Sequence, residues 1–168
     1  MARILLSVML LKLGPEDVPY SHRLLRQVII FNAISGIIVL STRVEAQLAV
    51  MNMALDLGLL FGFSYFLLRA LNKLPRFVQT ITALGGVGIF FHLLTWPLLA
   101  QFSVEDSSDN ARAIAALLML CLISWQVLVF AHIFRRAIDS SMSSAIALSF
   151  ALFLFSVTAS QLLFPDLQ

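Results

Sequence analysis

The sequence predicts an all-α transmembrane helix bundle, and composition, apolar runs and charge distribution each indicate that class. Of its 168 residues, 60% are hydrophobic and 12% are charged, and the mean hydropathy is +0.95. A soluble domain is about 45–50% apolar and about 25% charged, and a small domain leaves much of its surface exposed. We therefore expect most of the surface of this protein to face lipid.

Apolar runs of about 17 to 25 residues, the length that a helix needs to cross a bilayer, occur five times. They cover residues 26–42, 47–69, 77–100, 112–134 and 141–164. We expect one transmembrane domain, residues 26–168, after a separate N-terminal segment, residues 1–25. The first run is short, so an alternative merges it with the second into a re-entrant hairpin and leaves three full spans.

The basic residues favour five spans, because five spans gather most of them on one side. That side holds Arg3, Lys12, Arg23, Arg26, Arg69, Lys73, Arg76, Arg135 and Arg136. The other side holds two basic residues, Arg43 and Arg112, beside the acidic Glu45, Glu105, Asp106, Asp109 and Asp166. The positive-inside rule then predicts a cytoplasmic N-terminus and an external C-terminus, in a membrane of the bacterial inner-membrane type.

The N-terminal segment begins with an apolar run from Ile4 to Leu11, which is too short to span a bilayer. It lacks the small-residue cleavage site of a signal peptide. We expect it either to lie on the cytoplasmic surface with its apolar side among the lipid headgroups, or to cap the helix bundle. The residues leave both arrangements open.

Asp56 is the one formal charge deep inside a predicted span. An unpaired charge at that depth costs about 2.5–3.5 kcal/mol on insertion scales, so we expect a neutral, hydrogen-bonded carboxyl group. At a rise of ~1.5 Å per residue, Asp56, Asn32 and His92 lie roughly 12–15 Å from the outer ends of three consecutive spans. Asn52 lies one helical turn from Asp56 on the same face. The sequence therefore predicts an intramembrane polar cluster of these four residues.

This cluster has three interpretations: a buried hydrogen bond that fixes which helices pack together, a proton relay or ion site, and a contact to a helix of a partner protein. Small residues let helices approach closely in lipid. We predict packing seams at six of them, Gly58, Gly62, Gly85, Gly88, Ala147 and Ala151.

Several classes of site lack their residues. Cys121 is the only cysteine, so neither an internal disulfide nor a thiolate metal site is possible. We expect no metal, no cofactor and no enzymatic activity, because no catalytic or metal-binding motif is present. Nucleic acid is not an expected partner either. Arg135 and Arg136, at the basic end of the fourth span, are expected to contact lipid headgroups.

The leader "LKLGPEDVPYSHRLL" followed by five closely spaced spans resembles the Yip1-domain family of small membrane proteins. The resemblance covers residues 11 to 164 and is architectural. The Asp-Leu-Tyr-Gly-Pro motif of the eukaryotic members is missing, so no functional residue carries over. The resemblance implies a membrane adaptor or organising role more than an enzyme.

We expect a structural, adaptor or complex-organising role in the membrane, with membrane lipid, other membrane subunits or a second copy as partners. The alternative is a small permease or proton-coupled transporter that uses Asp56 and His92, with Asn32 and Asn52 along the path. A third reading, a lipid-binding or lipid-modifying protein, depends on Arg135, Arg136 and the N-terminal segment alone.

Overall fold

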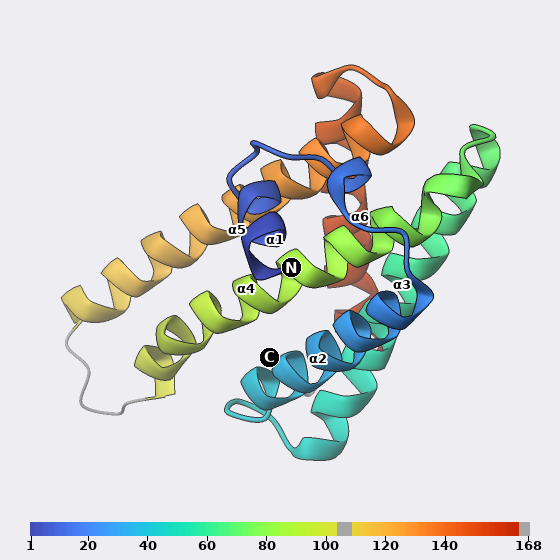
Figure 1. Cartoon of the computed structure of the whole chain (residues 1–168). Helices are drawn as coiled ribbons and strands as arrows, with labels where there is room; N and C mark the ends of the chain where they lie inside the picture. Colours follow the sequence, from blue (N-terminus) through green and yellow to red (C-terminus); the bar gives the residue numbers. More distant parts are fainter. Residues whose placement is uncertain (104–108, 165–168) are drawn as a thin grey trace.

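The structure, a computed structural model, describes residues 1–103 and 109–164, and this part of the chain contains helices and no strand (Figure 1). The helices are α1 (Ala2–Met9), α2 (His22–Leu40), α3 (Ala46–Ala70), α4 (Phe77–Ser103), α5 (Asp109–Ile138) and α6 (Met142–Leu163), with 3-10 turns at Pro15–Asp17 and Leu74–Arg76. Helices α2 to α6 are long and apolar enough to cross a membrane. This confirms the all-α class and the five long apolar segments. Glu105, Asp106 and Asp166 lie outside the described residues.

The ends of the helices follow from local sequence. Ser21 and Ser141 precede α2 and α6, and each hydroxyl accepts a hydrogen bond from the backbone N–H three residues later, at 3.3 and 3.2 Å. Such caps satisfy one of the free N–H groups at a helix start. Asn72 and Asp139 have φ values of 54° and 53° in the turns after α3 and α5. Asn and Asp tolerate this left-handed conformation better than most residues, so both turns stay short.

Helix α4 is the central helix of the bundle. Within its most apolar window, 61% of the residues are buried, against 11–22% for the other four long helices. Its Leu84, Val87 and Phe91 form one hydrophobic core with Val129 and Phe134 of α5. Helices α1, α2, α3 and α5 therefore share α4 as a packing partner, whereas α6 packs on α5 and α3 (Figure 1).

The N-terminal helix α1 packs against α4 and α5 (Figure 1). Its Leu5, Val8 and Met9 are buried, and the Leu5 side chain fills the space beside Gly86, where a Cβ would meet it at 2.5 Å. Gly86 lies roughly 13 Å along α4 from Phe77 at ~1.5 Å per residue. Of the two arrangements expected from the sequence, the structure has α1 docked on the bundle.

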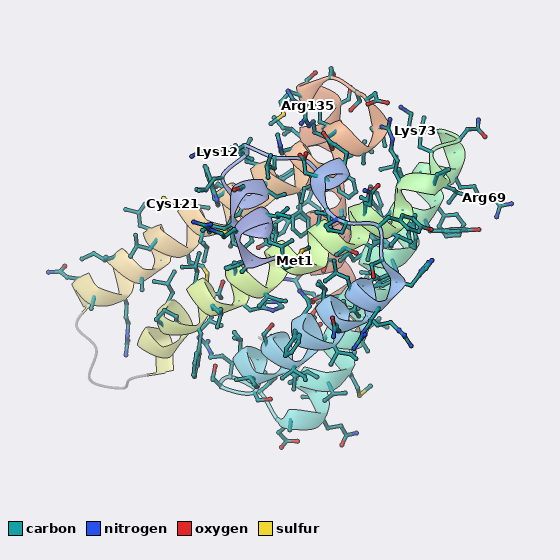
Figure 2. The ribbon with its side chains drawn as sticks, viewed as in Figure 1. Met1, Lys12, Arg69, Lys73, Cys121 and Arg135 are labelled. Atoms are coloured by element: carbon teal, nitrogen blue, oxygen red, sulfur yellow. The ribbon has the colours of Figure 1, made fainter. Side chains whose placement is uncertain are left out.

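Polar contacts tie the N-terminal segment and two turns together at the basic end of the bundle, where Figure 2 labels Lys73 and Arg135. Asp139 pairs with Lys73 and with Arg76, the latter at 2.9 Å, and Arg76 also donates to the carbonyls of Arg136 and Ala137 at 3.2 and 3.0 Å. Farther out, the Arg136 Nε lies 2.7 Å from Glu16. These contacts join the turn after α3, the end of α5 and the turn at residues 15–17.

The predicted seam glycines of α4 lie against α2, whereas the predicted seam residues of α3 and α6 face away from the described part of the bundle. A Cβ at Gly85 would lie 3.1 Å from Ile29, and one at Gly88 would lie 2.4 Å from the Asn32 amide nitrogen, so α2 approaches α4 closely there. Nothing lies within 4 Å of a Cβ added at Gly58 or Gly62. Ala147 and Ala151 are exposed. Helix α6 instead packs through the face that carries Ala145, Ser149 and Leu152.

Candidate functional site

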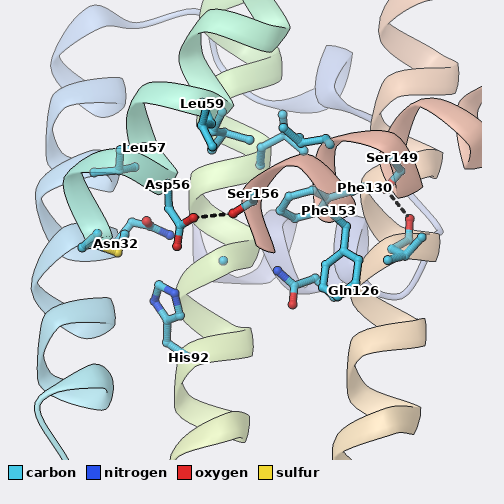
Figure 3. Close-up of a pocket in the computed structure, with 16 residues that line it drawn as sticks. Asn32, Asp56, Leu57, Leu59, His92, Gln126, Phe130, Ser149, Phe153 and Ser156 are labelled. Carbon is cyan, nitrogen blue, oxygen red and sulfur yellow. Dashed lines mark hydrogen bonds between the residues drawn. The ribbon is translucent and has the colours of Figure 1, made fainter. Parts of the chain in front are cut away.

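A polar cavity of about 150 Å³ lies inside the bundle where the five long helices meet (Figure 3). We call it the central cavity. Its polar lining consists of Asn32 from α2, Asp56 from α3, His92 from α4, Gln126 from α5, and Ser149 and Ser156 from α6. Its apolar lining consists of Met53, Leu57, Leu59, Leu60, Leu84, Gly88, Val127, Phe130, Leu152 and Phe153. Each long helix therefore supplies at least one polar side chain to the same space.

Asp56 is held by Ser156, whose hydroxyl donates to one carboxyl oxygen across the α3–α6 contact (Figure 3). The second carboxyl oxygen receives no hydrogen bond from any described residue. Asp56 lines the central cavity, so this oxygen remains available to whatever occupies it.

The amide of Asn32 is fixed by the close approach of α2 to α4. Its Nδ2 donates to the carbonyl oxygen of Gly85 at 2.8 Å, and the absent side chain of Gly88 leaves the room for it. This bond sets the orientation of the amide, because only the nitrogen can donate. The Oδ1 atom is left as an acceptor with no partner among the described residues.

The Ser35 hydroxyl contacts both the backbone of α2 and the ring of His92. It lies 3.0 Å from the carbonyl oxygen of Asn32, to which it can donate its single hydrogen. It also lies 2.9 Å from the His92 Nδ1 atom, and the ring donates in that contact when the Ser35 hydrogen goes to Asn32. A neutral imidazole with its hydrogen on Nδ1 has a bare acceptor at Nε2. Figure 3 shows the ring pointing into the central cavity toward Asp56 and Asn32.

Gln126 and Ser149 complete the polar lining on the side of α5 and α6. Ser149 donates to the carbonyl oxygen of Val127 at 2.8 Å, and this hydrogen bond links α6 to α5. Gln126 makes no hydrogen bond with a described residue, and its amide points into the cavity in Figure 3. It therefore supplies both a donor and an acceptor to the same space.

The structure thus brings together three of the four residues of the predicted polar cluster. Asn32, Asp56 and His92 line the central cavity, although none of them bonds another through its side chain. Asn52 does not line it; its Oδ1 accepts from the hydroxyl of Ser160 on α6 at 2.7 Å. Asn52 therefore forms a second hydrogen bond between α3 and α6, one helical turn from Asp56.

The prediction missed the residues that α5 and α6 contribute. Ser149, Ser156 and Ser160 are spaced seven and four residues apart, so they share one face of α6 at 100° per residue. That spacing was a usable signal. So was Gln126, an amide inside the apolar run "CLISWQVLVF", because polar side chains within spans usually face the bundle interior.

Two side-chain contacts lie at the basic end of the bundle. Arg136 pairs with Glu16, and Arg135 is half-buried beside it. His132, near the same end of α5, bonds the carbonyl oxygen of Leu13 at 3.0 Å and is 7% exposed. His132 therefore holds the N-terminal segment against the bundle.

Comparison with known proteins adds no relative: no protein-family model, no curated protein and no solved structure matches the chain. The functional argument therefore depends on the geometry of the central cavity.

Proposed function

We propose that this protein is a small permease or proton-coupled transporter of the multi-pass membrane class, with its binding site in the central cavity. The observation that carries the proposal is that Asp56, His92, Asn32 and Gln126 come from four helices and direct unpaired polar atoms into one cavity. Cavities with a few convergent polar groups are the usual place for small-ligand sites. Ionisable residues inside membrane spans most often mark ion or substrate pathways.

A purely structural role accounts for only part of this arrangement. One atom each of Asn32, Asp56 and His92 forms an interhelical hydrogen bond, and such bonds do hold membrane helices together. The second polar atom of each of these side chains forms no interhelical hydrogen bond with a described residue. These atoms are reachable from the central cavity, because the one fully buried, unpartnered side-chain atom among the described residues is the Ser64 hydroxyl, so water or a ligand in the cavity can bond them. A cavity of about 150 Å³ has room for either, since one water takes roughly 30 Å³ of liquid volume.

The proposed orientation places the basic end of the bundle, with Lys73, Arg76, Arg135 and Arg136, in the cytoplasm. The positive-inside rule supports it, and we assign the protein to a membrane of the bacterial inner-membrane type on the same ground. The turn at residues 15–17, tied to that end through Glu16 and Arg136, is then cytoplasmic as well.

Asn52 offers a matched control that separates transport from bundle stability. Asn52 and Asp56 both accept a hydrogen bond from a serine of α6, and only Asp56 lines the cavity. We expect purified protein in liposomes to carry protons or solute, Asp56→Asn to abolish that flux, and Asn52→Ala to preserve most of it. Equal losses in both variants would favour the structural role, and absence of flux in the wild type would refute transport.

A second candidate, the adaptor or complex-organising role, is supported by small residues that no described part of the chain covers. A Cβ at Gly58 or Gly62 meets no atom within 4 Å, and these two residues form the small-xxx-small spacing that favours helix association. Here the partners are other membrane subunits or a second copy, as the Yip1-domain resemblance implies. The test is co-purification in mild detergent: Gly58→Leu should release a bound subunit, and an unchanged set of co-purifying proteins would count against this role.

A further inference from the structure

We propose that the central cavity binds a small ammonium-type cation, either ammonium itself or a short primary alkylammonium ion. The inference rests on the proposed function and adds the chemical class of the ligand. It is carried by the hydrogen-bonding character of the cavity wall, which can be read atom by atom from the bonds already described.

Three unpaired acceptors face the cavity from three helices. They are the Oδ1 atom of Asn32, the second carboxyl oxygen of Asp56 in its ionised form and the Nε2 atom of His92 in the tautomer with its hydrogen on Nδ1. An ammonium group has three or four N–H donors and no acceptor, so it complements this set. A ligand that offers acceptors finds one flexible donor, the Gln126 amide, because the Ser149 and Ser156 hydroxyls already donate elsewhere.

The charge of the cavity lining also favours a cation. Asp56 is the one acidic residue among the cavity-lining residues that the structure describes, and no Lys or Arg is among them. A cation taken out of water needs a nearby opposite charge, and a bound ammonium ion lets the carboxyl group of Asp56 ionise. A bound anion would have no cationic side chain to pair with and would face only the carboxylate of Asp56. The rings of Phe130 and Phe153, which also line the cavity, add the aromatic surface that favours cations.

The wall suits an ammonium ion better than a metal ion. Calcium takes six to eight oxygen ligands, and magnesium requires octahedral oxygen coordination, whereas this cavity offers three fixed acceptors, one of them an imidazole nitrogen. In the described part of the chain, no three His, Cys, Asp or Glu side chains lie close enough to hold a metal. The leucines at positions 60, 84 and 152 form an apolar wall against which a short alkyl group can pack.

The test is uptake of radiolabelled methylammonium into liposomes that contain the full-length protein, at about pH 6, where an alkylamine is almost entirely protonated. Matched vesicles without protein give the leak of free amine. Acetamide and acetate, which are similar in size, serve as neutral and anionic probes. We expect saturable methylammonium uptake that ammonium and propylammonium compete away, with little uptake of either other probe. Asp56→Asn should reduce the uptake at least about tenfold, as expected for loss of a charged hydrogen-bond partner, and Asn52→Ala should reduce it far less.

The wild-type probe panel keeps the inference testable even where Asp56→Asn does not fold. Uptake of acetamide or acetate without methylammonium would overturn the ammonium assignment and leave the permease proposal standing. Proton flux without methylammonium uptake would have the same meaning. Vesicles that carry neither protons nor any of the probes would overturn both proposals.

Discussion

Replacing Gly88 by alanine tests the close approach of α2 and α4 that shapes the central cavity. A Cβ at this position would lie 2.4 Å from the Nδ2 atom of Asn32. That atom cannot simply move away, because it is the donor in the 2.8 Å bond to the carbonyl oxygen of Gly85. Gly88→Ala should therefore push α2 from α4 or break this bond.

The size of the effect follows from three terms. Alanine is favoured over glycine in a helix by about 1 kcal/mol. Overpacking costs about 1–3 kcal/mol, and the lost hydrogen bond costs about 0.5–1.5 kcal/mol. The net expectation is a destabilisation of about 0.5–3.5 kcal/mol. Gly58→Ala is the matched control, because its Cβ meets nothing within 4 Å, and it should be neutral or stabilising by up to about 1 kcal/mol.

The assay is reversible unfolding of the purified protein in mixed micelles as the denaturing detergent is increased, followed by circular dichroism. Gly88→Ala should unfold at a lower fraction of denaturing detergent than the wild type, and Gly58→Ala at the same or a higher fraction. If both variants were equally stable, α2 and α4 would not be in the close contact described, and the orientation of Asn32 would lose its basis.

Three further changes test other parts of the structure. Ser35→Ala removes the hydrogen-bond partner of the His92 Nδ1 atom; we expect a several-fold higher KM for methylammonium with unchanged stability, and an unchanged KM would exclude this positioning role. The pKa of Asp139 is lowered by its hydrogen bonds to Lys73 and Arg76, so its contribution to stability is complete above its ordinary value of 3.8 and is lost as pH falls through the lowered pKa; Asp139→Asn should be less stable than wild type at neutral pH, with the gap closing in acid. His132→Phe removes the bond to Leu13 and should speed hydrogen exchange in residues 2–9 relative to α6, whereas uniform exchange rates would argue against that tie.

The composition and charge pattern were sufficient to predict the five long helices. Their boundaries differ from the predicted runs by a few residues, because helical hydrogen bonding continues into the flanking polar residues, as at His22 before the first run and at Ile138 after the fourth. The rise per residue was also sufficient to place Asn32, Asp56 and His92 near one level, and all three line the central cavity.

What could not be predicted is which helices are neighbours. The depth of a residue along its span does not determine which helix lies beside that span. Depth alone predicts Asn32 or His92 as the neighbour of Asp56, whereas the hydrogen-bond partner of Asp56 is Ser156. In lipid, both faces of a helix can be apolar, so hydrophobicity does not mark the buried face. For that reason small residues predict a seam on α6 at Ala147 and Ala151, which are exposed, whereas the helix packs through its serine face.

The most direct test of the central claim is a comparison of Asp56→Asn with Asn52→Ala in one liposome assay of proton and methylammonium movement. Both residues accept a hydrogen bond from α6. Asp56→Asn keeps an acceptor for Ser156, whereas Asn52→Ala removes the acceptor for Ser160, so a loss of helix packing affects Asn52→Ala at least as much, and only Asp56 lines the central cavity. A transport site there predicts that Asp56→Asn is inactive while Asn52→Ala keeps most of the wild-type rate. Equal activity in the two variants would contradict it.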